Sequence, residues 1–214
     1  MEINIKGNLL DLNKPKIMGI LNVTPDSFFD GGLYNTEKKV DTQVMKMIEE
    51  GMDILDVGGY SSRPGAKEIS INEEIDRVIP VVKFIRKTYP ELILSVDTFR
   101  SEVARNCLDL GIDIINDISA GCIDKNILDV VAEYNCPYIM MHMKGTPQTM
   151  QINPEYENLI KELLMLLLFL NLVRSYLILQ FQKSNIFAGS LPGLEALVAM
   201  YQQRTHQKLN ISKK

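Results

Sequence analysis

Short apolar runs alternate with longer segments in which apolar residues recur at helical spacing, and this pattern continues to about residue 160. Five apolar runs of four to six residues are predicted as strands, at 17–22, 54–57, 92–96, 112–115 and 138–141. Four segments between them carry apolar residues three and four positions apart, as on one face of a helix. Strands that alternate with amphipathic helices are typical of parallel β/α units, in which helices cover the sheet. The pattern therefore predicts an α/β fold.

The apolar positions also predict which residues the helices bury. They are Val40, Val44, Met47, Ile48 and Met52 in the first helix, Ile75, Val78, Ile79, Val82 and Ile85 in the second, Val103, Ala104, Cys107 and Leu108 in the third, and Ile127, Leu128 and Val131 in the fourth. Pro80 stands inside the second segment, where a proline can kink a helix.

The pattern changes after Pro154. Residues 163–172 are apolar on all sides, so a single amphipathic helix does not account for them. This run is also shorter than the about 20 apolar residues that a transmembrane helix needs. We therefore divide the chain into a β/α portion, residues 1–162, and a C-terminal segment, residues 163–214, for which no structure is predicted.

Composition and charge narrow the classes of partner. The 214 residues are 46% hydrophobic and 23% charged, with a net charge of −4, and no stretch clusters Lys and Arg densely enough to follow a phosphate backbone. We expect neither a nucleic acid nor a membrane as partner. The three cysteines are far apart and form no C-x-x-C pair, which favours a reducing cytoplasm over a disulfide framework or a zinc site. Residues 1–12 lack the apolar core of a signal peptide, so secretion is not expected.

Polar residues follow each predicted strand at its carboxyl end, where parallel β/α folds build their active sites. These strand-end residues are Asn22, Asp56, Asp97, Asn116 with Asp117, and His142. Long loops follow the first two strands, and the second loop carries Arg63 between Ser62 and Pro64. Connections in such folds usually take about 2–6 residues, so loops of this length favour a substrate-covering role.

A structural interpretation stands beside the functional one at each position. A single Asn or Asp at a strand end commonly caps the next turn or helix, which applies to Asp97, Asn116 and Asp117. Asp56, beside two glycines, fits a turn or a supporting role, and His142 alone fits a packed, hydrogen-bonded histidine. Arg63 differs, because an arginine in a Gly/Pro loop has little structural task and its guanidinium suits a phosphate.

Taken together, these segments resemble the dihydropteroate synthase family. The resemblance rests on N-V-T-P-D-S-F-F-D-G-G at 22–32, G-G-Y-S-S-R-P-G at 58–65, S-V-D-T at 95–98, N-D at 116–117 and M-H-M-K-G-T-P at 141–147, and it covers Lys16 to about Lys161. It implies a TIM-type (β/α)8 barrel, incomplete here, with about five clear β/α units. The implied reaction joins p-aminobenzoate to 6-hydroxymethyl-7,8-dihydropterin pyrophosphate and releases pyrophosphate, with Mg2+ as cofactor and a possible homodimer.

The resemblance also implies roles for single residues. Asn22 would lend its carbonyl oxygen to Mg2+, Arg63 would bind the pyrophosphate, and Ser62 would add one hydroxyl contact. Asp97 and Asn116 would contact the donor and acceptor edge of the pterin. The candidate catalytic residues are thus Arg63, Asp97 and Asn116, and the candidate substrate-binding residues are Ser62, Arg63, Asp97, Asn116, Thr24, Pro25, Asp26, Ser27, Pro64 and His142.

Two other functions stay open. The family's later motifs, a D-P-G-x-G-F-x-K loop, a serine-arginine-lysine strand end and an arginine-x-histidine pair, are not found after residue 163. A chain without them could bind pterin and yet be inactive. A methyltetrahydrofolate-type pterin methyltransferase would share the region of Asp97 and Asn116 but gives no reason for the loops at 24–32 and 61–65.

Overall fold

The computed structural model describes residues 2–23, 33–61, 67–150 and 152–166. Its helices and strands are β1 Glu2–Ile5, β2 Asn8–Asp11, β3 Met18–Asn22, α2 Leu33–Glu49, β4 Ile54–Gly58, α3 Ile71–Thr88, β5 Ile93–Asp97, α4 Ser101–Asp109, β6 Ile114–Asp117, α5 Asn126–Glu133 and β7 Tyr138–Met140. Contacts divide the chain into two units, Met1–Glu157 and Asn158–Lys214. Of the second unit, the described part ends at residue 166 and is helical from residue 159.

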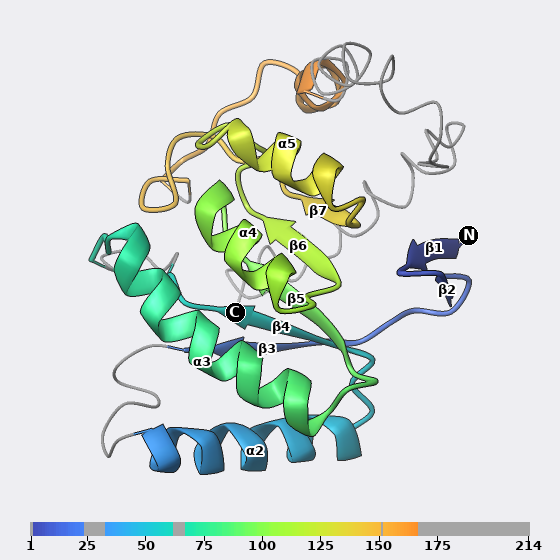
Figure 1. Cartoon of the computed structure of the whole chain (residues 1–214). Helices are drawn as coiled ribbons and strands as arrows, with labels where there is room; N and C mark the ends of the chain where they lie inside the picture. The colour runs from blue at the N-terminus through green and yellow to red at the C-terminus, as the bar shows by residue number, and fades with distance from the viewer. Residues whose placement is uncertain (1, 24–32, 62–66, 151, 167–214) are drawn as a thin grey trace, which may run out of the picture. The chain divides into compact units, whose positions relative to one another are not determined.

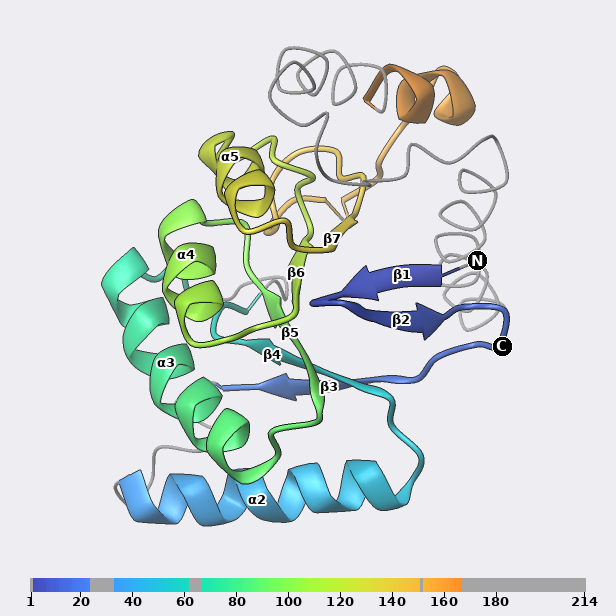
Figure 2. The same ribbon diagram turned by 45° about the vertical axis from the view of Figure 1, so that its right-hand side comes forward.

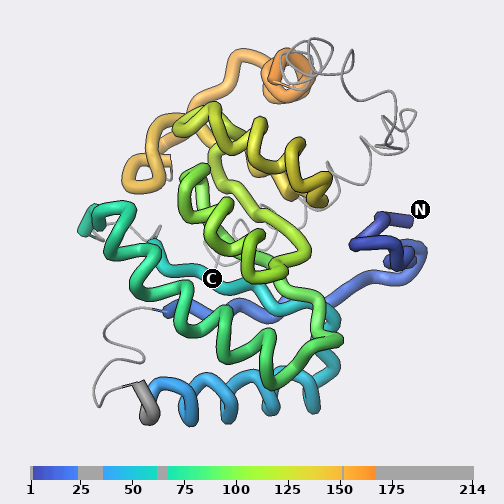
Figure 3. The backbone as a smooth tube through the Cα atoms, in the orientation of Figure 1, coloured from blue at the N-terminus to red at the C-terminus, as the bar shows by residue number. Residues whose placement is uncertain are grey.

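Five parallel strands form one sheet in the order β3-β4-β5-β6-β7, as the alternation of apolar runs predicts. Figures 1 and 2 show α2, α3, α4 and α5 on the same face of this sheet. Figure 3 shows the backbone alternating between a strand of the sheet and a helix on that face. The α/β fold is confirmed, and the five parallel strands with four helices between them are consistent with an incomplete barrel. The strand order follows the chain order, so the polar strand ends are neighbours in space.

Side chains alternate along each strand, so one face of the sheet packs against the helices and forms the core. We call the opposite face the inner face of the sheet. Leu55, Val57, Val96 and Ile115 are fully buried and pack against the helices. The residues between them in sequence point to the opposite face, because successive side chains in a strand alternate. The inner face is therefore where strand-end polar groups can meet.

The predicted helix faces are confirmed in most positions. Val103, Ala104 and Cys107 of α4 have no exposed surface, and in α3 Val81 and Glu74 join the buried residues. Helix α3 begins with a capping box, in which Ser70 Oγ accepts from the Glu73 N–H and Glu73 accepts from the Ser70 N–H. Such a box stabilises the helix start by about 1 kcal/mol.

Three details of the helix predictions need correction or comment. Helix α2 ends at Glu49, so Met52 lies beyond it, and Gly51 with φ of 92° makes the turn after the helix. Ile48 is 40% exposed and not on a buried face. Helix α3 continues through Pro80 from Ile71 to Thr88.

The strands β1 and β2 form an antiparallel hairpin that the apolar pattern does not predict. Lys6 and Gly7 lie between the paired residues Ile5 and Asn8 and both have positive φ, as a two-residue type I′ turn requires. The hairpin packs Ile5 on Ile54 and Ile114 of the sheet. It therefore covers the inner face near the strand starts, at the end opposite the polar strand ends.

Asp113, just before β6, pairs with one cation from the hairpin and one from helix α3. Lys6 Nζ lies 2.7 Å from one carboxylate oxygen and Arg86 Nη2 lies 2.6 Å from the other. The second oxygen also accepts from the backbone N–H of Leu94 at 2.9 Å. The Lys6 side chain is 54% exposed, so water screens its pair with Asp113, and we expect that pair to contribute at most about 1 kcal/mol.

Within the described residues, we find no helix with the length and apolar character that would let it cross a membrane.

Candidate active site

Four strand-end residues lie side by side in one row across the sheet. In the parallel register, Asn22 of β3 is opposite Gly58 of β4, Gly58 is opposite Asp97 of β5, and Asp97 is opposite Asn116 of β6. Their sequence neighbours belong to the core under the helices, so the row faces the inner side of the sheet. The structure thus brings together three predicted site residues that are up to 94 positions apart (116 − 22).

Gly58 makes room between the polar groups of this row. A Cβ atom at Gly58 would lie 3.4 Å from Asn22 Oδ1 and 3.7 Å from Asp97 Oδ2. Both oxygens therefore border the small space above Gly58. A longer side chain at this position would project into the space between the Asn22 amide and the Asp97 carboxylate.

The amide of Asn116 is oriented by a buried carboxylate. Asn116 Nδ2 donates to Asp56 Oδ2 at 2.9 Å, and Asp56 is only 3% exposed. A carboxylate only accepts hydrogen bonds, so the amide nitrogen must face it. Asn116 Oδ1 is then held on the other side of the amide as an acceptor. The contact with Asn116 favours a supporting role for Asp56 over a role in a turn.

Asp117 has a different environment from its neighbour Asn116. It has no exposed surface, and its carboxylate accepts from the N–H and Oγ of Ser119, the N–H of Gly121 and the hydroxyl of Tyr138. Burial raises the pKa of the Tyr138 hydroxyl, and the Asp117 charge raises it further. Asp117 therefore organises the turn after β6 and does not join the row.

His142 follows β7 and lies beside Tyr156, with 5.8 Å between the ring centroids and a tilt of 52°. Lys144 Nζ lies 4.3 Å from the centroid of the same Tyr156 ring and donates to the carbonyl of Glu155 at 2.5 Å. The loop after β7 is thus packed against residues 155–156. The substrate-binding role of His142 stays a prediction.

Seven predicted site residues lie outside the described part of the chain. They are Thr24, Pro25, Asp26, Ser27, Ser62, Arg63 and Pro64. Their roles in substrate binding and catalysis stay predictions.

The described residues suit a magnesium ion only if water and substrate phosphates supply most of its oxygen ligands. Among the described residues, no three His, Cys, Asp or Glu side chains lie together as a metal site would need. Mg2+ takes six oxygen ligands and commonly keeps waters and substrate phosphates among them. One amide oxygen from Asn22, near the Asp97 carboxylate, fits a Mg2+ that arrives with a pyrophosphate group and does not fit a protein-only cage.

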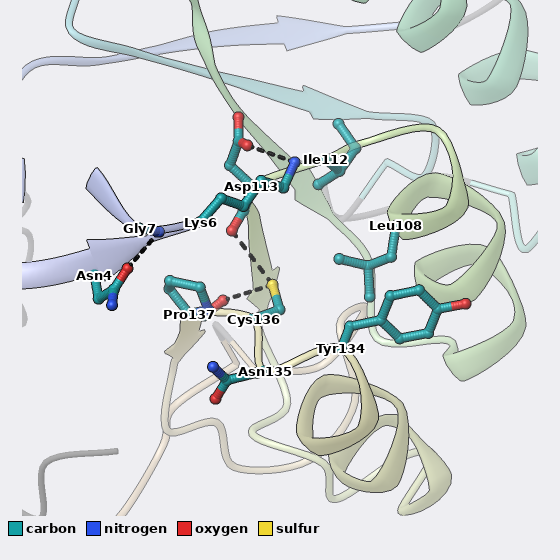
Figure 4. Close-up of a pocket in the computed structure, with 10 residues that line it drawn as sticks. All are labelled: Asn4, Lys6, Gly7, Leu108, Ile112, Asp113, Tyr134, Asn135, Cys136 and Pro137. Atoms are coloured by element: carbon teal, nitrogen blue, oxygen red, sulfur yellow. Dashed lines mark hydrogen bonds and ion pairs between the residues drawn. The ribbon is translucent and has the colours of Figure 1, made fainter. Parts of the chain in front are cut away.

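A hollow of about 330 Å³ lies at the end of the strands opposite the row of polar strand ends (Figure 4). It is lined by the hairpin turn and by the segments before β6 and β7, including Lys6, Asp113 and Cys136. Asp113 is already paired with Lys6 and Arg86. We therefore assign this hollow to the joint between hairpin and sheet.

The cysteines are expected to differ in reactivity. Burial raises the pKa of the Cys107 and Cys136 thiols to about 12, and partial burial and the Asp117 charge also raise the pKa of the Cys122 thiol, but Cys122 is exposed and so accessible to a reagent. Because the thiolate is the nucleophile, native protein treated with an aromatic disulfide reagent at pH 8 should release one equivalent of thiol rapidly and three in denaturant. The Cys122→Ser variant should lose the rapid phase. A rapid phase that persists in this variant would contradict the burial of the other two thiols.

The chain matches one protein family and is similar to known dihydropteroate synthases. The profile of the family described as "Pterin binding enzyme" matches residues 18–187, which extends past the last motif at 141–147. The dihydropteroate synthase of Staphylococcus haemolyticus is 53% identical over 131 residues, covering 61% of this chain and 48% of the relative.

Two solved structures are similar over 79% of the chain. A Yersinia pestis dihydropteroate synthase in complex with a sulfonamide drug has a TM-score of 0.70 and 38% identity, with 61% of its chain covered. A Xanthomonas albilineans dihydropteroate synthase with 4-aminobenzoic acid has a TM-score of 0.65 and 39% identity, with 59% covered. The chain thus spans about half to three fifths of the length of these relatives.

Proposed function

The chain belongs to the family of pterin-binding enzymes, and on that basis we propose that it acts as a dihydropteroate synthase in folate biosynthesis. The proposed reaction condenses 6-hydroxymethyl-7,8-dihydropterin pyrophosphate with p-aminobenzoate. The observation that carries the proposal is the row of Asn22, Asp97 and Asn116 at one edge of the sheet, with Gly58 leaving space between the first two.

The chemistry accounts for the residue types in this row. The amine nitrogen of p-aminobenzoate forms a bond to the pterin methylene carbon, the C–O bond to pyrophosphate breaks with its electron pair, and the amine loses a proton. Positive charge develops on the methylene and negative charge on the leaving pyrophosphate. Catalysis therefore depends on groups that stabilise separated charges.

Asp97 and Asn116 would bind the pterin. The Asp97 carboxylate can accept two N–H bonds from an aminopyrimidine edge, and such charge-assisted bonds are stronger than neutral ones. Asn116 would offer Oδ1 as an acceptor, because its amide nitrogen is engaged by Asp56 at 2.9 Å. This pairing gives Asp56 an indirect role, since it fixes which end of the amide the pterin meets.

Asn22, Ser62 and Arg63 would hold the pyrophosphate. The Arg63 guanidinium suits a bidentate contact with phosphate oxygens, Ser62 would add a hydroxyl, and Asn22 would contribute one oxygen to Mg2+. When bound, Mg2+ would neutralise part of the charge on the leaving group.

The loops after the first two strands would order p-aminobenzoate. Thr24, Pro25, Asp26, Ser27 and Pro64 are the proposed contacts, and His142 would approach from the loop after β7. Closing these loops would exclude water from a cationic carbon centre, which protects it from hydrolysis. A relative that was solved with 4-aminobenzoic acid supports this choice of second substrate.

The proposal extends to domains, setting and assembly. Residues 1–162 would form the pterin-binding barrel portion and residues 163–214 a separate segment. The scattered cysteines and net charge of −4 favour a cytoplasmic protein without nucleic-acid or membrane partners. A homodimer is proposed from the family resemblance, and light scattering after size exclusion would give its mass.

A second candidate is a pterin-binding protein without turnover, which the row of strand-end residues favours, because these groups suit the binding of a pterin whether or not a reaction follows. Such a protein would keep the row of Asn22, Asp97 and Asn116 and bind pterin through it.

Pyrophosphate release by the purified chain separates the two candidates. The assay contains dihydropterin pyrophosphate, p-aminobenzoate and Mg2+, and Arg63→Ala is measured beside the wild type. A synthase predicts release that depends on p-aminobenzoate and is lost in Arg63→Ala. Folded wild-type protein that binds pterin but releases no pyrophosphate would refute the synthase and leave the binding protein.

A further inference from the structure

Arg100 makes an unusual set of contacts just beyond the proposed site. It follows β5 at the start of α4, three residues after Asp97. Its guanidinium donates to Glu74 Oε2 at 2.9 Å and to the carbonyl oxygen of Ile69 at 2.6 Å. The same group lies 5.2 Å from the centroid of the Tyr60 ring and 5.3 Å from that of Phe99.

Two of these contacts lie on either side of one loop. Tyr60 follows β4, and Ile69 precedes α3, so the chain between them is the loop after the second strand of the parallel sheet. Its residues 62–66 are outside the described part of the chain, but both of its ends are described. One guanidinium therefore joins the beginning and the end of this loop to the segment that follows Asp97.

We call the contacts of Arg100 with the two ends of this loop the joint, and the surroundings of Arg100 make it rigid. Tyr60 and Phe99 are each 7% exposed and pack edge to face with 5.1 Å between centroids. The side chains of Arg100 and Glu74 are 11% and 0% exposed. Burial raises the pKa of the Glu74 carboxyl, and the Arg100 charge opposes that rise. A buried pair of this kind fixes both side chains, because breaking it would leave one charge alone in the interior.

The joint also reaches the loop after β7 and the row of polar residues. Gln148 Nε2 donates to the Tyr60 hydroxyl at 2.6 Å. The backbone N–H of Arg100 donates to Thr98 Oγ1 at 3.2 Å, and the backbone N–H of Thr98 donates to the carbonyl of Asn116 at 3.0 Å. Arg100 is thus bonded into the same backbone segment that carries Asp97.

From this geometry we infer that Arg100 is a positioning residue, which sets the ends of the loop from Tyr60 to Ile69 relative to Asp97. Arg100 acts through this loop and does not itself touch the substrate. The inference rests on the proposed function where it concerns ligands, since the loop carries Arg63, the proposed pyrophosphate ligand. A lysine cannot replace it, because an ammonium is a point charge and lacks the planar fork that reaches two partners while lying over a ring.

The test compares the full chain with Arg100→Lys, Glu74→Gln and the control Arg105→Lys. Arg105 is on the same helix but pairs with Glu133 at the surface. Two quantities are measured: amide hydrogen exchange in peptides that cover residues 60–61 and 67–70 without ligand, and affinities for inorganic pyrophosphate with Mg2+ and for a pterin.

In Arg100→Lys, exchange at 67–70 should rise about tenfold, pyrophosphate affinity should fall about tenfold and pterin affinity should change by less than about threefold. Arg105→Lys should match the wild type. Glu74→Gln should lower the urea midpoint and raise exchange at 67–70 by less than Arg100→Lys does, since Arg100 loses its buried counter-charge but keeps its contacts with Tyr60 and Ile69.

Wild-type exchange at 67–70 in Arg100→Lys would overturn the inference. Equal losses of pyrophosphate and pterin affinity would also overturn it, because they would indicate a general structural role. If the wild type binds neither ligand, the proposed function fails and the exchange result alone decides whether Arg100 holds the loop.

Discussion

Replacing Asp97 by asparagine is expected to weaken pterin binding about 100-fold, which corresponds to about 3 kcal/mol. The carboxylate can accept two N–H groups of the pterin edge, whereas an asparagine presents an NH2 group to one of them. A donor then faces a donor, and the remaining bond loses its charge assistance. The free energy of unfolding should change little, because Asp97 is partly exposed at the end of β5.

Fluorescence titration of a reduced pterin measures this effect directly. The control is Asp129→Asn, which makes the same chemical change at an exposed position of α5. Thermal unfolding of both variants, followed by circular dichroism, establishes that they are folded. Wild-type affinity in Asp97→Asn would mean that the pterin does not bind at the row formed by Asn22, Asp97 and Asn116.

The sequence was sufficient to predict the parallel sheet and most of the buried helix faces. Each strand of the sheet is an apolar run, and each helix repeats its apolar residues every three or four positions, so the pattern directly reflects the burial. The β1–β2 hairpin was missed because its strands are short and expose residues such as Leu9, which is 64% exposed. Its turn residues Lys6 and Gly7 were the available signal.

The candidate site was predictable in its members but not in its contacts. Strand ends are local features of sequence, and parallel pairing brings them together, so Asn22, Asp97 and Asn116 could be named together. The hydrogen bond from Asn116 to Asp56 spans 60 residues. The contact of Arg100 with Ile69 likewise depends on how α3 and α4 pack, which no local pattern describes.

The N-D pair at 116–117 shows why strand alternation decides what composition cannot. Both residues are polar strand ends, and both could cap a turn when read singly. Ile115 is fully buried under the helices, so Asn116 must face the inner side and Asp117 the helix side. One residue of the pair therefore becomes available to a ligand while the other is enclosed by donors from its own turn.

Substituting Asp117 by alanine is expected to lower the free energy of unfolding by about 3–5 kcal/mol, a large part of the about 5–15 kcal/mol that typically stabilises a domain. The buried carboxylate accepts hydrogen bonds from two backbone N–H groups and two hydroxyls at 2.6–2.8 Å. Removing it leaves these four donors without an acceptor at a position that water does not reach. Urea unfolding at pH 7 measures the loss. Asn116→Ala, one residue earlier, removes one donor to the buried Asp56 carboxylate and should also lower the free energy of unfolding, but by less than Asp117→Ala, which leaves four donors unpaired, and it should weaken pterin binding. Tyr138→Phe removes a single donor and should cost only about 1 kcal/mol.

If Asp117→Ala unfolds at the wild-type urea midpoint, the turn after β6 does not depend on this carboxylate, and the division of the pair into a ligand-binding and a structural residue is wrong.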